Sequence, residues 1–191
     1  MPCNKFELDE HDRQTVLSIA KQSIEYGLQN NMPLPIEPLE YPQSLQQITA
    51  TFVTLNHHGQ LRGCIGTLQA QRPLISDVAE HAFAAAFRDP RFSPLTKEEF
   101  SDIEVHISLL TTPEELKASS EKELLQKLRP GVDGLILQDD WHQATFLPSV
   151  WQQLPDATQF LHHLKEKAGL PGNYWSDELR FKRYHAVSIE Y

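Results

Sequence analysis

The chain of 191 residues has only two cysteines, Cys3 and Cys64, and no long run of apolar residues. Two cysteines cannot form a disulfide framework or supply the four cysteine ligands of a structural zinc site. The longest apolar run, residues 82–87, is far too short to cross a bilayer, and the first residues lack the apolar stretch of a signal peptide. We therefore expect a cytoplasmic protein with reduced thiols and no membrane segment.

Positive charge is also scarce, because 17 lysines and arginines face 26 aspartates and glutamates, a net charge of −9. Proteins that bind nucleic acid usually present a basic face, so this class of function is not expected. The one net-positive window, residues 61–91, contains arginine and no lysine. Its members are Arg62, Arg72, Arg88 and Arg91. Guanidinium forks suit carboxylate or phosphate, which favours a small anionic substrate, and four ordinary surface arginines are the alternative.

Apolar periodicity and capping residues predict helices over 8–30, 73–88, 120–128 and 156–169, with Asp9, Ser120 and Asp156 as N-caps. Alternation and turn residues predict strands over 48–55, 61–68, 103–110, 134–137, 142–146 and 180–191. Two hairpins are expected, one joined near 57–60 and one near 138–140. Because helices and strands do not alternate regularly, we expect an α+β fold with a mainly antiparallel sheet. We expect a single domain over 1–191, which can include a larger and a smaller lobe.

The most unusual segment is Leu-Arg-Gly-Cys-Ile-Gly-Thr at residues 61–67, called the signature segment below. Glycines inside a strand, here Gly63 and Gly66, are typical of a bulge or of a close approach by backbone or ligand. A two-residue period places Arg62 on the same side as Cys64, and a thiol beside a guanidinium holds more thiolate. Backbone N–H groups near the glycines are candidates to stabilise an oxyanion. The alternative is that Cys64 is a buried structural thiol.

Histidines provide the candidates for proton transfer. On the strand over 103–110, His106 shares a face with Glu104 and Ser108, so Glu104 or His106 is the expected acid or base. The pairs at 57–58 and 162–163 are adjacent and lack the spacing that aims two ligands from a helix, so no metal site is predicted. His81 follows Asp77 by one helical turn, which predicts a surface pair.

Asp89 and Arg91 follow the end of the 73–88 helix, next to Pro90. One interpretation is that Arg88 and Arg91 bind an anionic group while Asp89 orients one of them. The other is that Asp89 and Arg91 tie this loop to the sheet through buried hydrogen bonds, as short Asp-Pro turns often do. The sequence leaves both open.

Several ordered segments together resemble the AMMECR domain family, whose prokaryotic members are called AmmeMemoRadiSam system protein A. The matching segments are residues 61–67, 84–92, 107–110, 131–134, 144–151 and 165–170. The resemblance implies an α+β fold in which the signature segment lines a functional site. It also implies association with a Memo-like protein and a radical SAM enzyme.

Residues and resemblance together predict an enzyme, or a component of one, acting on a small anionic substrate around Cys64. The predicted substrate-binding residues are Arg62, Gly63, Gly66, Arg88 and Arg91, and the predicted catalytic residues are Cys64 and either Glu104 or His106. No cofactor is expected. The alternative is a non-catalytic binding or docking module for the Memo-like and radical SAM partners.

Overall fold

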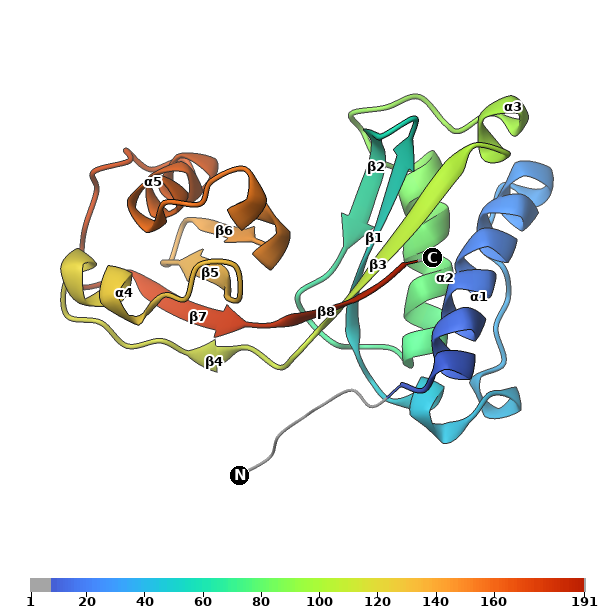
Figure 1. The fold of residues 1–191 in the computed structure, drawn as a ribbon, viewed down its shortest axis with the longest axis horizontal. Coiled ribbons are helices and arrows are strands. Elements are labelled where there is room, and N and C mark those ends of the chain that lie inside the picture. Colours follow the sequence, from blue (N-terminus) through green and yellow to red (C-terminus); the bar gives the residue numbers. More distant parts are fainter. Residues whose placement is uncertain (1–7, 191) are drawn as a thin grey trace. The chain divides into compact units, whose positions relative to one another are not determined.

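The computed structural model describes residues 8–190, which form two compact units. The first unit contains residues 8–110 and 187–190, and the second runs from Thr111 to Ala186. Each unit is built on one four-stranded sheet with helices packed on it (Figure 1). The predicted α+β class with mainly antiparallel strands is therefore confirmed.

The first unit has the strand order β2-β1-β3-β8. Its strands are β1 (Ala50–His57), β2 (Gln60–Gly66), β3 (Ile103–Leu110) and β8 (Ala186–Ile189), and its α-helices are α1 (Glu10–Asn30), α2 (Leu74–Phe87) and α3 (Lys97–Phe100). Two short 3-10 helices, Pro38–Glu40 and Gln43–Gln46, lie in the proline-rich connector before β1. The fixed backbone angle of proline suits such irregular connections.

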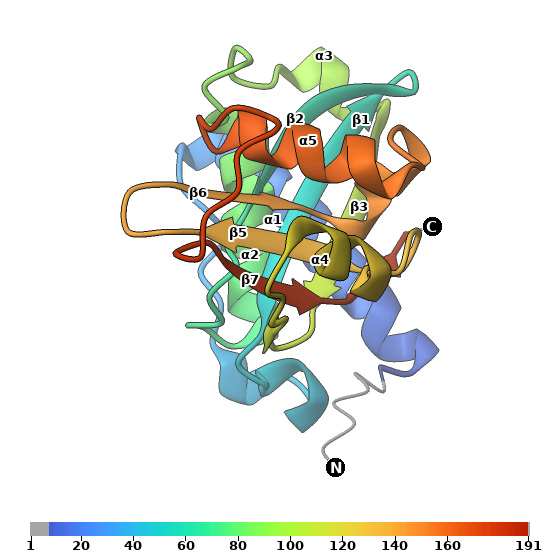
Figure 2. The same cartoon turned by 90° about the vertical axis from the view of Figure 1, so that its left-hand side faces the viewer.

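The second unit has the strand order β4-β7-β5-β6, with α4 and α5 packed around it (Figure 2). Its elements are β4 (Glu114–Glu115), α4 (Glu121–Lys127), β5 (Gly134–Gln138), β6 (Gln143–Phe146), a 3-10 helix (Pro148–Gln152), α5 (Ala157–Lys167) and β7 (Arg180–Tyr184). The predicted hairpin of β5 and β6 is confirmed. The single strand predicted over 180–191 is wrong, because the chain leaves one sheet after Tyr184 and enters the other at Ala186.

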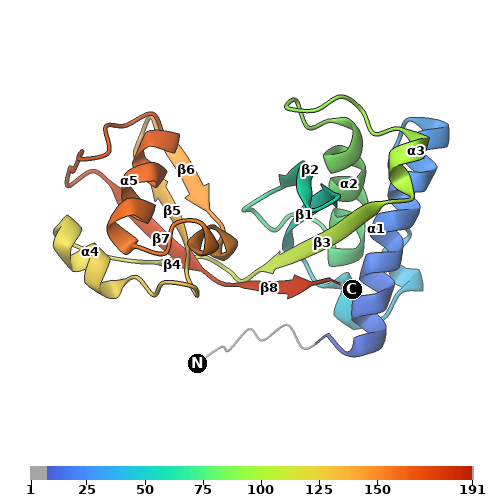
Figure 3. The same ribbon diagram turned by 45° about the horizontal axis from the view of Figure 1, so that its top comes forward.

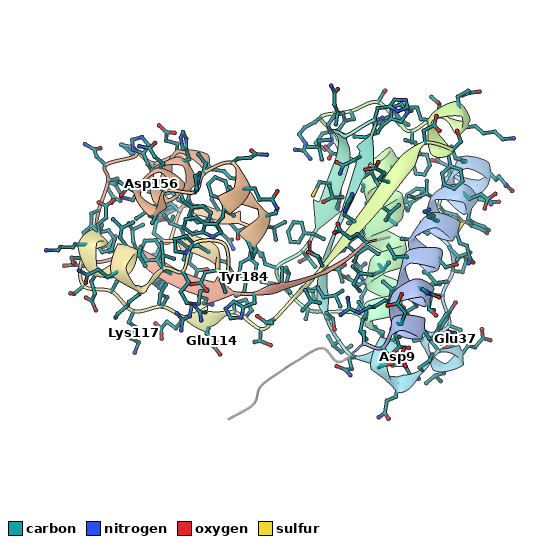
Figure 4. The ribbon with its side chains drawn as sticks, in the orientation of Figure 1. Asp9, Glu37, Glu114, Lys117, Asp156 and Tyr184 are labelled. Carbon is teal, nitrogen blue, oxygen red and sulfur yellow. The ribbon has the colours of Figure 1, made fainter. Side chains whose placement is uncertain are left out.

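Helix starts follow the capping residues read from the sequence. The Asp9 carboxylate accepts the Asp12 N–H at the start of α1, and Asp156 accepts the Gln159 N–H at the start of α5 (Figure 4). Ser120 caps α4 in the same way. Each cap gives a partner to one of the N–H groups that a helix start leaves free.

The predicted hairpin that carries the signature segment is confirmed. β1 and β2 are antiparallel, with Thr54 opposite Cys64 and His57 opposite Gln60. A bulge between Leu55 and Asn56 leaves Arg62 as the extra residue on β2. Such a bulge bends the strand and interrupts its alternation locally.

Helices α1 and α2 lie together on one face of the first sheet (Figure 3). The side chains of this face form the core of the unit with the two helices; those from β1 and β3 are Val53, Leu55, Ile103, Val105, Ile107 and Leu109. Because side chains alternate along a strand, the intervening residues Thr54, Cys64 and His106 lie on the opposite face. The alternation of side chains along each strand thus places the core residues on one face of the sheet and the polar residues on the other.

No helix among residues 8–190 is both long and apolar enough to cross a membrane. α1 has 21 residues but carries charged side chains in its first turn. α2 is apolar but has 14 residues, fewer than the roughly 20 that span a bilayer.

Candidate functional site

The polar face of the first sheet carries three side chains in one row. Thr54 of β1 lies opposite Cys64 of β2 on one side and opposite His106 of β3 on the other. Directly opposite residues of antiparallel strands project to the same face. Because the backbones of neighbouring strands are about 4.8 Å apart, the backbones at Cys64 and His106 are about 10 Å apart, with Thr54 between them.

Cys64 is half-buried, so its thiol is not sealed in the core. The Thr54 hydroxyl donates a hydrogen bond to Cys64 Sγ at 3.1 Å. The backbone N–H of Cys64 donates to Asp89 Oδ2 at 2.9 Å. This amide is therefore already satisfied, and the expectation that it stabilises an oxyanion is wrong for Cys64 itself.

Asp89 joins the loop after α2 to strand β2. The residue is 4% exposed, and its carboxylate accepts hydrogen bonds from the Cys64 N–H and from Arg91 N, Nε and Nη2. The Arg91 guanidinium, followed by the two backbone N–H groups, holds the pKa of Asp89 well below its ordinary range and outweighs the opposing effect of burial. These contacts are the buried ties of the structural interpretation.

Arg91 also brings positive charge to the thiol. Its Nη2 lies 3.5 Å from the Cys64 carbonyl oxygen. Its pKa is raised, chiefly by the hydrogen bonds to Asp89 and in smaller part by the Coulombic attraction of Cys64. The guanidinium beside Cys64 is therefore that of Arg91.

Arg62, which period two placed beside the thiol, is engaged elsewhere. Its Nε and Nη2 donate to the two carboxylate oxygens of Glu99 at 2.8 and 3.0 Å, and Nη2 also donates to the Ser93 carbonyl. The bulge breaks the alternation at this residue, which explains the difference. Arg62 Nη1 is buried without a hydrogen-bond partner among the described residues.

Two of the predicted arginines meet at one aromatic ring. The guanidinium carbons of Arg62 and Arg91 lie 5.8 and 5.4 Å from the centre of the Phe92 ring. Arg88 does not join them, because it pairs with Glu80 and lies over Phe83. The structure thus brings Arg62 and Arg91 together and leaves Arg88 apart.

Both glycines of the signature segment are sites of close backbone approach. A Cβ atom at Gly63 would collide with the Ala85 carbonyl of α2, and one at Gly66 would collide with Thr51 and Phe52 of β1. Neither glycine has a positive φ, so space and not backbone conformation requires glycine here. The structure gives both a packing role.

The two ring nitrogens of His106 differ in their contacts within the described residues. Nδ1 lies 2.6 Å from Glu190 Oε2, and because a carboxylate can only accept, the Nδ1–H donates. Nε2 is buried and has no hydrogen-bond partner within residues 8–190, and Glu104 Oε2 lies 3.8 Å from it. Glu190 thereby orients the imidazole, as carboxylates do for histidines that transfer protons. Nothing in the sequence around His106 pointed to Glu190, which lies 84 residues away.

A second polar cluster was not expected, and it corrects the predicted surface pair on α2. Asp77 and His81 are 1% and 6% exposed, so both are buried. Asp77 accepts hydrogen bonds from the Thr51 hydroxyl at 2.7 Å and from Arg72 Nε at 3.0 Å, and its Oδ2 lies 3.2 Å from His81 Nδ1. Burial raises the pKa of Asp77, but the hydrogen bonds from His81, Thr51 and Arg72 outweigh burial and lower it. These satisfied contacts tie the start of α2 to β1.

Among the residues that the structure describes, one group of three side chains could hold a metal ion. It consists of His57, His58 and Asp102, whose ligand atoms lie within 4.8 Å of one another. The group lies at the β1–β2 turn and does not include Cys64.

The Arg62–Glu99 pair predicts an unusually acidic carboxyl. The two hydrogen bonds from Arg62, supported by the Thr96 N–H, lower the pKa of Glu99 to about 2. We expect NMR titration to give this value in the wild-type chain and a return toward the ordinary value of about 4.3 in Arg62→Gln. Because the folded-state pKa is lowered, the stabilisation is present above pH about 4.5 and is lost as the pH falls toward 2. An ordinary Glu99 pKa in the wild-type chain would contradict the pairing.

Known proteins are similar to this chain in both sequence and fold. A family model described as AMMECR1 matches residues 17–189. A protein of Methanothermobacter thermautotrophicus is 39% identical over 94% of this chain and 94% of its own. A protein of Saccharolobus solfataricus is 35% identical over 95% of this chain and 82% of its own. The crystal structure of an uncharacterized protein from Pyrococcus horikoshii has a TM-score of 0.86 at 31% identity, covering 96% of this chain and 93% of that chain.

The fold and the site define an α+β protein with two sheets, in which a glycine-flanked cysteine lies on the polar face of one sheet. The chain belongs to the AMMECR1 family, and the family model extends across both compact units. The resemblance read from the ordered motifs is confirmed.

Proposed function

We propose that this protein is an enzyme, or the thiol-bearing component of one, that acts on a small anionic substrate at the row Cys64–Thr54–His106. The observation that carries the proposal is the hydrogen bond from the Thr54 hydroxyl to Cys64 Sγ on the polar face of the sheet. A hydroxyl that donates to sulfur stabilises negative charge on a reacting thiol. A thiol that only filled a core would have apolar neighbours instead.

Two further features support chemistry at this row. His106 is oriented by Glu190, and its Nε2 has no hydrogen bond to any residue that the structure describes, an arrangement that suits a proton-transfer group. The spacing of about 10 Å between Cys64 and His106 would place them at the two ends of a small substrate lying across β1. Cys64 is the proposed nucleophile, and His106 the proposed proton-transfer group.

The preference for an anion rests on Arg91. Its side chain is 54% exposed while Asp89 holds it in place, so a substrate can reach the guanidinium without disturbing the buried carboxylate. The guanidinium of Arg62, whose Nη1 has no hydrogen-bond partner in the described part of the chain, lies near the same Phe92 ring. A carboxylate or phosphate would complete these donors.

The working context proposed is that of the family resemblance, a system with a Memo-like protein and a radical SAM enzyme. A docking module for those partners would need apolar surface at the signature segment. Within residues 61–67 the exposed large apolar side chain is Leu61, and the row Cys64–Thr54–His106 consists of polar side chains. The surface therefore favours chemistry over docking.

Thiol labelling tests the site directly. In a Cys3→Ser background, we expect iodoacetamide to modify Cys64 at neutral pH faster than it modifies the same thiol in the unfolded chain. Thr54→Val, which keeps the shape and removes the hydroxyl, should slow this labelling several-fold, whereas Thr54→Ser should not. Ser108→Ala, on the same face of β3, is the matched control and should leave the rate unchanged. Labelling slower in the folded chain than in the unfolded one would remove Cys64 from the proposed site.

Metabolite profiling tests the function. A strain lacking this protein should accumulate an anionic compound that also accumulates without the Memo-like or radical SAM protein. Wild-type chain should clear the compound, and Cys64→Ser should not, although its melting temperature stays close to that of the wild type. Clearance by Cys64→Ser would refute the catalytic role of the thiol, and unrelated compounds in the three strains would refute the shared system.

A further inference from the structure

The β1–β2 turn places two imidazoles beside a carboxylate from a distant part of the chain. His57 is the last residue of β1, and in the register it lies opposite Ile103, the first residue of β3. Asp102 directly precedes Ile103 and so reaches the same end of the sheet. The ligand atoms of His57, His58 and Asp102 lie within 4.8 Å of one another.

The turn itself holds the two rings together. It is a two-residue turn in which His58 and Gly59 both have positive φ, 51° and 74°. Such turns favour Asn-Gly or Asp-Gly, so histidine at the first position is unusual although sterically accessible. The centroids of the His57 and His58 rings are 4.1 Å apart. An imidazole therefore occupies a position where asparagine fits the backbone best.

We propose that His57, His58 and Asp102 form a binding site for a divalent transition-metal ion of the Zn²⁺ type. Two imidazoles and one carboxylate are a donor set that zinc and related ions prefer. Ligand atoms on one zinc ion lie about 3 to 4 Å apart, so the present spacing closes with small rotations. His58 and Asp102 are exposed and free to make them.

The same donor set indicates what kind of site this is. Three protein ligands leave one position of a tetrahedral zinc ion for water or an anion, whereas structural zinc sites use four protein ligands. Glu99 lies close enough to His57 for its pKa to be lowered in part by that imidazole, but its carboxylate is held by Arg62. The proposed site is thus an open one, independent of the Cys64 row.

The chain contains its own matched control. His162 and His163 on α5 are also an adjacent pair with a carboxylate, since both lie within 3.2 Å of Glu166 oxygens. Their ring centroids are 5.8 Å apart, and this trio is not among the groups whose ligand atoms all converge. The two clusters have equivalent chemistry and differ in geometry.

Calorimetric titration of the untagged chain with ZnCl₂ tests the proposal. We expect one Zn²⁺ per chain in the wild type. His58→Asn should weaken binding at least tenfold while preserving the turn, because asparagine favours positive φ. Asp102→Ala should weaken it similarly, since losing even a group that only orients a ligand costs about 10- to 100-fold. His163→Gln should bind as the wild type does.

The outcomes separate clearly. Titration with Co²⁺ should give no thiolate charge-transfer band, which would show that neither cysteine is a ligand. Affinity unchanged within twofold in both His58→Asn and Asp102→Ala would overturn the proposal. A loss confined to His163→Gln, or a thiolate band, would overturn it equally by placing the ion elsewhere.

Discussion

Gly63→Ala is expected to lower the free energy of unfolding by about 3 kcal/mol. The new Cβ would meet the Ala85 carbonyl, a backbone atom in the last turn of α2. A side chain can rotate away from such a collision, but a helix backbone cannot, so β2 and α2 would have to separate. Urea unfolding followed by circular dichroism measures the loss.

Gly59→Ala provides the comparison for this prediction. No atom of the described residues lies within 4 Å of a Cβ added at Gly59, but its φ is 74°. Alanine there pays only the cost of the left-handed conformation, about 1 kcal/mol. If Gly59→Ala were the more destabilising of the two, the close approach at Gly63 would be refuted.

Asp89→Ala is expected to destabilise the protein by about 2 to 3 kcal/mol. The substitution leaves the Cys64 N–H without its acceptor and removes the carboxylate that holds Arg91. Losing the acceptor of a buried donor costs its desolvation, and losing one member of a buried ion pair adds to this. Because Arg91 is half exposed, water compensates part of the loss.

Asp140→Ala is the matched control, since Asp140 also binds an arginine, Arg180 Nη2 at 3.0 Å, but both side chains are exposed. Its cost should stay below about 1 kcal/mol. The effect of Asp89→Ala should also depend on pH. The lowered pKa of Asp89 makes its contribution full above pH about 4 and smaller as the pH falls, so the two chains should converge in acid. Equal losses for the two aspartates would contradict the burial of Asp89.

Local chemistry explains why much of the fold is readable in the sequence. The caps Asp9, Ser120 and Asp156 each act on an N–H group within three residues, and the hairpin of β1 and β2 needs only alternation and the His58–Gly59 turn. The ordered motifs likewise identify the AMMECR1 family, which the family model confirms over 17–189. These signals lie within short stretches of chain, so no tertiary information is required to read them.

The contacts between the site residues could not be predicted from the sequence in this way. Register brings Thr54 between Cys64 and His106, and the loop after α2 brings Asp89 and Arg91 to the edge of β2. A single bulge residue was enough to turn the predicted partner of the thiol from Arg62 into Arg91. Strand alternation is a local rule, and one extra residue breaks it without leaving a recognisable pattern in the sequence.

Local patterns in the sequence are enough to predict the α+β class, the family, the positions of the main helices and hairpins, and Cys64 as the central site residue. The burial of Asp77 and His81, the contact of Glu190 with His106, and the approach of Asp102 to His57 and His58 all depend on tertiary packing. The physical reason is that capping, turn and periodic preferences act over a few residues. Burial and side-chain convergence depend on which strands and helices pack together, here for example across the 84 residues that separate His106 from Glu190.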